Sequence, residues 1–333
     1  MEKVVIALDA MGGDYAPEQT VKGAVEAVNS SDEIRVILVG KQDMIAKELE
    51  KYEYAKEDIE VVHASEIIDM GDVPTVAIKD KKDSSLVVAM RLVREGKADA
   101  LVSAGSTGAV LVGGQLVVGR LKGIKRPPLA PFIPTTKGFS LLIDCGANVD
   151  ARPEHLVQFA QMGSIYYENV MGKKNPTVAL LNIGTEEEKG NQLVKDTKPL
   201  MKDCKNINYI GSVEARELVS GAADVIVCEA FVGNVVLKFF EGLALTLFGS
   251  LKEGLMSSTR TKLGALLVKP ALKGLKNQFD TSSQGGAPLL GLKGLVVKAH
   301  GNSSSKEIEI ALKQCISFKK QKINEKIKES ICD

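Results

Sequence analysis

Residues 4–14 read VVIALDAMGGD. Five apolar residues lead directly into a turn that places two glycines between the carboxylates of Asp9 and Asp14. A short run that is apolar throughout is typical of a strand buried on both faces of a parallel sheet. Ligands of such sheets bind beyond the carboxyl ends of the strands. We therefore predict that Asp9, Gly12 and Gly13 help to bind a substrate, with ordinary turn chemistry as the alternative.

The same pattern recurs along the chain and predicts a doubly wound, mostly parallel α/β fold. Amphipathic stretches long enough to be crossover helices separate the apolar runs. The predicted strands are residues 4–8, 34–39, 100–102, 141–143, 178–181 and 225–227, and the predicted helices include residues 18–30, 84–95, 154–170 and 192–202. We expect one α/β domain with two lobes, and we place a soft boundary near residues 126–134, which are rich in proline.

The composition excludes several classes of protein. The chain has 333 residues with 44% hydrophobic and 26% charged residues, which is typical of a globular protein rather than a disordered one. A formal net charge of +1 and 5% aromatic residues argue against a nucleic-acid partner. Five widely spaced cysteines fit buried thiols in the cytosol. We expect no signal peptide and no membrane-spanning helix, because no apolar run approaches the roughly 20 residues that span a bilayer.

A second turn, residues 103–108, reads SAGSTG and precedes a predicted helix. Small residues allow backbone N–H groups to approach an anion, hydroxyls add donors, and a helix N-terminus favours negative charge. The turn lacks both the lysine of a P-loop and the glycine spacing of a dinucleotide fingerprint. It therefore predicts a phosphate site, with a serine N-cap as the alternative. The predicted phosphate-binding residues are Ser103, Gly105, Ser106, Thr107 and Gly108.

Polar turns also follow the later strands. We expect the turns together to form one cleft for an anionic or phosphate-bearing small molecule. We expect no metal there, because too few oxygen ligands and no histidine pair are present, and we consider Cys145 an improbable nucleophile. The further candidates are Asp144, Asn148, Asp150, Asn182, Gly184, Lys189, Asn234, Lys238 and His300.

The last third of the chain carries the main charge asymmetry. Residues 252–276 hold six basic residues against one acidic residue. After a long helix over residues 234–254, we expect Pro270 to break the following segment into two short helices. We predict an amphipathic basic hairpin over residues 252–280 that either packs in a dimer or contacts an anionic membrane surface. The predicted membrane-contacting residues are Leu263, Leu266, Leu267, Lys262, Lys269 and Lys273.

Five motifs together resemble the PlsX-type phosphate acyltransferases of bacterial phospholipid synthesis. They are DAMGGD at 9–14, SAGSTGA at 103–109, DCGANVD at 144–150, NIG at 182–184 and KAHG at 298–301. The resemblance covers residues 4 to about 320. It implies a homodimer with a fold similar to isopropylmalate dehydrogenase and phosphotransacetylase. It also implies transfer of an acyl group from acyl-[acyl carrier protein] to inorganic phosphate.

The sequence departs from this family at a few positions. Ser106 stands where the family usually has Asn, Glu229-Ala230 stands where it usually has Asp-Gly, and Val232 replaces a frequent Thr. These departures affect individual hydrogen bonds more than the expected reaction. Phosphate is already a nucleophile at neutral pH, so the reaction requires positioning and a stabilised oxyanion. Amide side chains such as Asn234 suit that role, and His300 or Lys238 can assist departure of the thiolate, with Lys189 as the next candidate.

Two alternatives remain at this point. One is a phosphotransacetylase-like enzyme that uses coenzyme A, and the other is a non-catalytic scaffold for an acyl carrier or a membrane. For the favoured reaction we expect no cofactor. We expect a cytoplasmic protein attached peripherally to the inner face of the membrane, where a membrane acyltransferase consumes the acyl phosphate.

Overall fold

All six strands predicted from the apolar runs form, and they divide between two sheets rather than one. The computed structural model describes residues 3–279 and 285–331. The chain divides into unit 1, made of Met1–Pro131, Gln161–Asn175 and Ser282–Asp333, and unit 2, made of Phe132–Ala160 and Pro176–Thr281. Helix α6 (Pro153–Met171) begins in unit 2 and ends in unit 1.

Unit 1 is built on a six-stranded sheet in the order β10-β11-β4-β1-β2-β3, in which only the edge strand β10 is antiparallel to its neighbour. The central strands are apolar throughout because helices cover both faces, and Ile6, Leu8 and Leu101 are fully buried. The strands are β1 (Val4–Asp9), β2 (Ile34–Gly40), β3 (Ile59–His63), β4 (Ala100–Ser103), β10 (Ala287–Leu289) and β11 (Leu295–Lys298).

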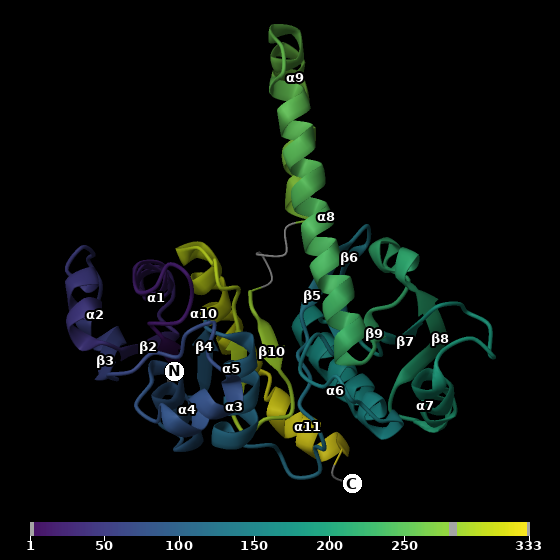
Figure 1. Cartoon of the computed structure of the whole chain (residues 1–333), viewed down its shortest axis with the longest axis horizontal. Helices are drawn as coiled ribbons and strands as arrows, with labels where there is room; N and C mark the ends of the chain where they lie inside the picture. Colours follow the sequence, from purple (N-terminus) through teal and green to yellow (C-terminus); the bar gives the residue numbers. More distant parts are fainter. Residues whose placement is uncertain (1–2, 280–284, 332–333) are drawn as a thin grey trace. The chain divides into compact units, whose positions relative to one another are not determined.

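The helices of unit 1 lie on the two sides of this sheet, as Figure 1 shows for α1 and α10 on one side and α3 and α4 on the other. The chain moves from β1 outward to β3 and then returns to β4 on the other side of β1. Crossovers of the usual right hand place helices on both faces when the direction reverses in this way. The helices are α1 (Glu18–Asn29), α2 (Gln42–Leu49), η1 (Lys56–Asp58), α3 (Pro74–Asp80), α4 (Ser85–Arg94), α5 (Thr107–Gly113), the π-helical η2 (Gly114–Val118), α10 (Ser305–Lys320) and α11 (Ile323–Ile331).

Unit 2 contains a five-stranded sheet in the order β5-β6-β9-β7-β8, again with one antiparallel edge pair, β5 and β6. Its core includes Leu142, Ala179, Leu181 and Ile226 from the central strands. The strands are β5 (Phe132–Thr135), β6 (Gly138–Ile143), β7 (Thr177–Asn182), β8 (Asn208–Glu214) and β9 (Val225–Val227), and the helices are α7 (Gln192–Asp203), η3 (Ala215–Ser220), α8 (Ala230–Met256) and α9 (Thr259–Gln278).

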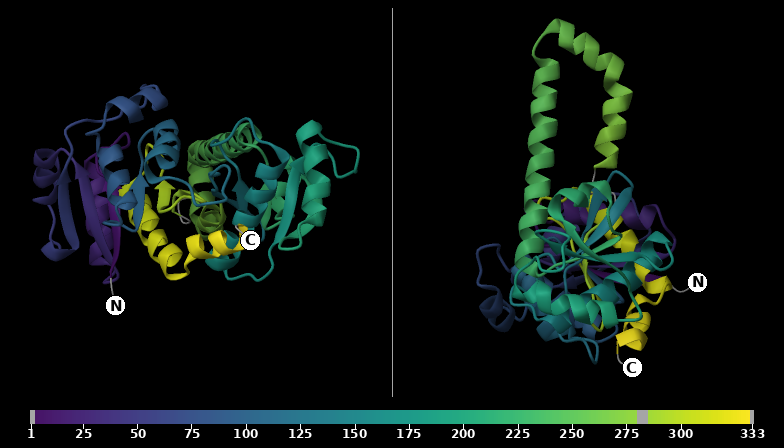
Figure 2. Two further views of the ribbon diagram at one scale, coloured as in Figure 1. Left: turned by 90° about the horizontal axis from the view of Figure 1, so that it is seen from below. Right: turned by 90° about the vertical axis from the view of Figure 1, so that its right-hand side faces the viewer.

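Helices α8 and α9 form a hairpin that projects from the rest of unit 2 (Figure 2, right). The prediction that Pro270 breaks the segment into two short helices is wrong, because α9 continues through Pro270 and the chain reverses between Met256 and Thr259. A proline inside a helix removes one backbone hydrogen bond and favours a kink, and Figure 2 shows that α9 bends along its length. Residue 280 of the predicted hairpin lies outside the described residues.

The expectation that no segment is long and apolar enough to span a membrane also needs correction. By length and composition alone, the 27-residue α8 is long and apolar enough to cross one, and it is the one such helix in the described part of the chain. The prediction considered uninterrupted apolar runs, whereas α8 accommodates Lys238 and Glu241 within a mostly apolar helix. Only 11% of the most apolar stretch of α8 is buried.

Candidate functional site

Three strand ends lie side by side in unit 1. Strand β4 pairs in parallel with both β1 and β11, and the register places Leu8 opposite Val102 and Lys298 opposite Ser103. The carboxyl ends of these strands therefore bring Asp9, Ser103 and Lys298 to one edge of the sheet. This is the edge at which open α/β sheets bind their ligands.

A short chain of hydrogen bonds joins the first two turns. The Ser103 hydroxyl donates to Asp9 Oδ2 over 2.7 Å and accepts from the Gly105 N–H over 3.1 Å. Gly12 lies directly against this chain, since a Cβ there would lie 2.4 Å from Asp9 Oδ2 and 2.8 Å from the Gly105 nitrogen. Two donors that the sequence assigns to phosphate binding, the Ser103 hydroxyl and the Gly105 N–H, are thus already used within the turns.

Burial dominates the electrostatics of Asp9, which is 2% exposed. Burial raises the pKa of its carboxyl group, while hydrogen bonds from Ser85 and Ser103 and the charge of Lys298 oppose that rise. Among the described residues, Oδ1 has no hydrogen-bond partner with ordinary geometry, although the Ser85 hydroxyl is near enough to lower the pKa. Asp9 therefore keeps hydrogen-bonding capacity that its surroundings leave unfilled.

Lys298 belongs to the KAHG motif, but the sequence reasoning gave it no role at the candidate site. It is the last residue of β11 and is buried, and its Nζ donates to the Ala299 carbonyl. A lysine that ends an apolar strand in register with Ser103 is the signal by which it could have been found. His300 follows two residues later and is exposed.

The first turn is also tied to the turn that follows β11. The Asp14 N–H donates to the Gly301 carbonyl over 2.7 Å. Gly13 adopts a φ of 106°, and a Cβ there would lie 2.9 Å from the same carbonyl oxygen. Only glycine adopts this backbone readily, so Gly13 permits the close approach of the two turns.

The second turn leads directly into α5, with Ser106 at the N-cap position. Ser106 precedes the helix without a side-chain capping bond, so the N-cap alternative does not describe its hydroxyl. Ser106 is buried and Thr107 is exposed. Gly108 is needed for packing, since a Cβ there would lie 2.6 Å from Cγ of Pro74 in α3.

In unit 2, Asp144 organises the turn that follows β6. It is fully buried, and its Oδ1 accepts from the Ala147 N–H over 3.1 Å. Its Oδ2 accepts from Asn148 Nδ2 over 2.7 Å. Asp144 and Asn148 are therefore brought together, and their contact stabilises their own turn. Asp150 is exposed at the end of that turn.

The start of α8 packs against the same turn. A Cβ on Gly233 would lie 1.9 Å from the Asp144 carbonyl oxygen, so the helix approaches as closely as a glycine allows. A Cβ on Gly146 would lie 3.8 Å from Asn234 Oδ1, which places this predicted catalytic amide beside the turn. Glu229 caps the helix by accepting from the Phe231 and Val232 N–H groups. Glu229 therefore provides an acidic N-cap at the position where the family usually has Asp.

Two other predicted residues of unit 2 are exposed. The Lys238 ammonium forms an ion pair with Glu241 over 2.8 Å, and its side chain is 60% exposed. Lys189 is exposed in the loop after β7. In that loop, Asn182 Nδ2 donates to the backbone carbonyls of Gly184 and Lys189, so its amide organises the loop itself.

Burial raises the pKa of the Cys145 thiol well above its ordinary value, and neighbouring Cys228 and Asp144 raise it further. Cys145 is therefore protonated at neutral pH and unsuited to nucleophilic attack. Over residues 3–279 and 285–331, no three histidine, cysteine or carboxylate side chains are grouped so that they could hold a metal ion.

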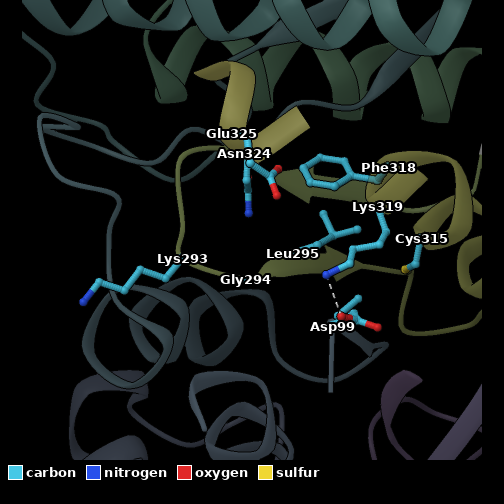
Figure 3. Close-up of a pocket in the computed structure, with 10 residues that line it drawn as sticks. Asp99, Lys293, Gly294, Leu295, Cys315, Phe318, Lys319, Asn324 and Glu325 are labelled. Carbon is cyan, nitrogen blue, oxygen red and sulfur yellow. Dashed lines mark ion pairs between the residues drawn. The ribbon is translucent and has the colours of Figure 1, made fainter. Parts of the chain in front are cut away.

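A pocket in unit 1 lies at the opposite edge of the sheet from the polar turns. Ala100 and Leu295, the first residues of β4 and β11, line it together with Phe318 and the ion pair of Asp99 with Lys319 (Figure 3). The candidate residues of unit 1 lie instead at the carboxyl ends of these strands. This pocket therefore contains none of the predicted site residues.

Known structures place the fold in a class. The chain is similar to a phosphotransacetylase from Streptococcus pyogenes, with a TM-score of 0.66 at 17% identity, covering 94% of this chain and 93% of that one. It is also similar to a branched-chain phosphotransacylase from Enterococcus faecalis, with a TM-score of 0.58 at 18% identity, covering 94% and 98%. The protein is thus an α/β protein with a phosphotransacetylase-like fold.

Sequence relatives define the family more narrowly. The family described as fatty acid synthesis protein matches residues 4–326. A phosphate acyltransferase from Alkaliphilus oremlandii is 54% identical, covering 98% of this chain and 97% of the relative. One from Clostridium acetobutylicum is 50% identical, covering 97% and 98%. The chain therefore belongs to the fatty acid synthesis protein family, the PlsX-type phosphate acyltransferases, as the motifs predict.

Proposed function

We propose that this chain transfers an acyl group from acyl-[acyl carrier protein] to inorganic phosphate. A phosphate oxygen attacks the thioester carbonyl carbon, and a C–O bond forms. The C–S bond then breaks, and the carrier thiolate leaves and takes up a proton. The products are an acyl phosphate, available for phospholipid synthesis, and the free carrier thiol.

One observation carries this proposal on the structural side: the joined turns at the carboxyl ends of β1, β4 and β11. Hydrogen bonding of Ser103 to Asp9 and of Gly105 to Ser103 makes them rigid. Catalysis of this reaction depends on positioning and on a stabilised oxyanion, which a rigid polar site provides. We assign the phosphate to the donors of Ser106, Thr107 and Gly108, next to Lys298.

Thiolate departure requires a proton or a nearby cation. His300 follows β11 in unit 1, and Lys238 lies on α8 in unit 2. Both are exposed, so both are accessible to a substrate. Alanine variants of the group that assists departure lose turnover more than affinity. If both variants keep near-normal turnover, Lys189 is the next residue to change.

The reaction is tested by mixing the purified chain with acyl-[acyl carrier protein] and titrating phosphate while free thiol is measured. We expect thiol release that depends on both the chain and phosphate. Acyl-coenzyme A, offered in parallel, separates this function from a phosphotransacetylase-like activity. Absence of phosphate-dependent thiol release from either substrate would identify a non-catalytic scaffold.

We further propose that the chain works as a cytoplasmic homodimer attached to the inner face of the membrane. The hairpin supports attachment, because leucines of α9 remain largely exposed although α9 packs with α8: Leu263 and Leu266 are 66% exposed and Leu267 is 84% exposed. Lys262, Lys269 and Lys273 are exposed on the same helix. Exposed leucines beside lysines suit an anionic lipid surface. Delivery there places the acyl phosphate near a membrane acyltransferase.

A further inference from the structure

One short segment of unit 1 exposes three large apolar side chains that have no role in the proposed phosphate site. Met70 lies in the loop before α3, Val73 directly precedes that helix, and Val76 lies in its first turn. Their exposed fractions are 60%, 61% and 53%. Apolar side chains that cluster on a surface mark a contact with a ligand or a partner. These three residues are the apolar patch of α3.

The loop that carries Met70 is fixed by Lys81. The Lys81 Nζ donates to the Ile67 carbonyl over 2.9 Å and to Asp72 Oδ2 over 2.6 Å. The same carboxylate oxygen accepts from the Asp69 N–H over 2.8 Å. The loop is therefore held in place by its own contacts, so a ligand that binds the patch does not have to order it first.

Helix α3 packs along α5 (Figure 1), and this places the patch beside the second turn. A Cβ on Gly108 would lie 2.6 Å from Pro74 Cγ, and a Cβ on Gly113 would lie 2.9 Å from Ile78 Cδ1. The first contact joins the starts of the two helices and the second joins their later turns, so the helices run side by side in the same direction. Val73, at the start of α3, therefore lies next to the turn over residues 103–108.

The proposed reaction constrains where the acyl chain of the substrate begins. Attack requires the phosphate oxygen and the thioester carbonyl carbon to lie about 3–3.5 Å apart. With phosphate held by Ser106, Thr107 and Gly108, the acyl chain starts at the second turn and continues along a neighbouring surface. Each methylene that leaves water for an apolar surface strengthens binding. An apolar surface next to this turn is therefore the favoured path for the chain.

The apolar patch of α3 meets this requirement within unit 1. We propose that Met70, Val73 and Val76 contact the acyl chain of the substrate and set the preference for its length. This inference rests on the proposed function, because it follows from the position of the phosphate. Exposure alone is not sufficient for this role: Leu116 is 67% exposed, but it lies in η2, beyond the other end of α5.

A combined variant, Met70→Gln with Val73→Thr and Val76→Thr, tests the proposal, because each change introduces a polar group and nearly keeps the size of the side chain. The measurement is kcat/KM for acyl-[acyl carrier protein] substrates with acyl chains of about 4 and about 16 carbons. We expect kcat/KM to fall about 10-fold for the long chain and less than about 2-fold for the short one. The KM for phosphate should stay within about 2-fold, since the phosphate donors are unchanged.

Two exposed residues away from α3 provide matched controls. Met44 is 44% exposed on α2, and Val219 is 40% exposed in η3 of unit 2. Met44→Gln and Val219→Thr repeat the same chemical changes at these surfaces. Both variants should leave the ratio of the two kcat/KM values unchanged within about 2-fold.

Photocrosslinking of the unmodified chain measures the contact directly. The probe is an acyl-[acyl carrier protein] whose acyl chain carries a diazirine, and phosphate is omitted so that transfer does not consume the probe. After irradiation, peptide mass spectrometry should find crosslinks within residues 70–76. Excess acyl-[acyl carrier protein] without the diazirine should suppress them, because both compete for one site.

Three outcomes would overturn the inference. An equal loss of kcat/KM for both chain lengths would show that the patch contacts the carrier protein, and a changed oligomeric state of the variant in analytical ultracentrifugation would show that it contacts a second copy of the chain. Unchanged kcat/KM values together with crosslinks only outside residues 70–76 would place the acyl chain elsewhere. If the unmodified chain releases no thiol in response to phosphate, the proposed function fails, whereas the crosslinks still report whether an acyl chain contacts the patch.

Discussion

Asp9 and Asp144 occupy equivalent places in two sheets, yet their surroundings differ. Each is buried at the carboxyl end of a parallel strand, β1 in unit 1 and β6 in unit 2. Both oxygens of Asp144 accept hydrogen bonds from its own turn. Asp9 instead links its turn to Ser103 of a neighbouring strand and keeps one oxygen without an ordinary partner among the described residues. Asp144 thus stabilises its own turn through both oxygens, whereas Asp9 has an oxygen that can accept a hydrogen bond from a ligand.

The largest effect is expected where a helix meets the Asp144 turn. Gly233→Ala places a Cβ 1.9 Å from the Asp144 carbonyl oxygen, so either α8 or the turn must move. We expect a loss of about 3 kcal/mol or more in the free energy of unfolding, measured by denaturant titration, since overpacking against backbone is poorly relieved.

Gly242→Ala is the matched control, because among the described residues no atom outside the adjacent backbone of α8 lies within 4 Å of a Cβ at that position. It should stabilise the chain by up to about 1 kcal/mol through helix propensity. If the two variants are equally stable, α8 does not approach the turn as closely as described, and the structural role of the Asp144 turn would be in doubt.

The two carboxylates can be compared directly by amide substitution. Asp144→Asn replaces one accepting oxygen with an NH₂ group, which then faces the N–H of Ala147 or of the Asn148 side chain. We therefore expect the free energy of unfolding to fall by about 1–3 kcal/mol. Asp9→Asn should change the free energy of unfolding at pH 7 by less than about 1 kcal/mol, while lowering phosphate-dependent turnover.

The dependence of the free energy of unfolding on pH provides a second comparison of the two carboxylates. The pKa of Asp9 is raised in the folded chain. Its carboxyl group therefore weakens the fold as pH rises above the pKa of the unfolded chain, about 3.9. Asp9→Asn should remove that part of the pH dependence between pH 4 and pH 7. Equal destabilisation by the two substitutions would show that both carboxylates are structural ties.

A smaller effect is expected at Glu309, which joins α10 to α1. Burial opposes its ionisation, but hydrogen bonds from Lys306, Lys313 and Ser30 prevail and lower its pKa to about 2 from 4.5. Since the folded pKa is depressed, the stabilisation is present above pH 4.5 and is lost as pH falls toward 2.

Glu309→Gln should therefore reduce the free energy of unfolding by about 1–2 kcal/mol at pH 7, discounted because its lysine partners are partly exposed. The difference from the unmodified chain should shrink as pH falls toward 2, and exposed Glu329→Gln should show no difference. A difference that is independent of pH would indicate lost packing instead of a lost ionic interaction.

The sequence alone predicts most of the central strands and crossover helices, because a strand that is buried on both faces appears as an unbroken apolar run. The predicted strands omit β3, β5, β8, β10 and β11. In β3 and β8, exposed or partly exposed residues such as Glu60, Asn208 and Ser212 break the apolar run.

Asp9 and Ser103 could be predicted as neighbours because both end parallel strands. The burial of Lys198 in α7 could not, because a buried lysine and a surface lysine look alike in a helical pattern. Its Nζ donates to the backbone carbonyls of Glu186, Glu187 and Lys189, a contact that the local sequence does not reveal.

Substitution of an exposed leucine in the hairpin should change the free energy of unfolding least of all, but it should strongly weaken membrane binding. Leu267 is 84% exposed on α9, so Leu267→Glu should change the free energy of unfolding by less than about 0.5 kcal/mol. Burying one leucine in lipid is worth about 1.5–3 kcal/mol, so co-sedimentation with anionic vesicles should weaken by about 10-fold or more. High salt should weaken binding of the unmodified chain as well, because lysines contribute through screened attraction. Leu116→Glu, at a leucine of unit 1 that is 67% exposed, should bind vesicles normally. If Leu267→Glu co-sediments like the unmodified chain but shifts the oligomeric state in analytical ultracentrifugation, the leucines face a second copy of the chain. The exposed leucines of α9 would then mark a dimer interface rather than a membrane contact.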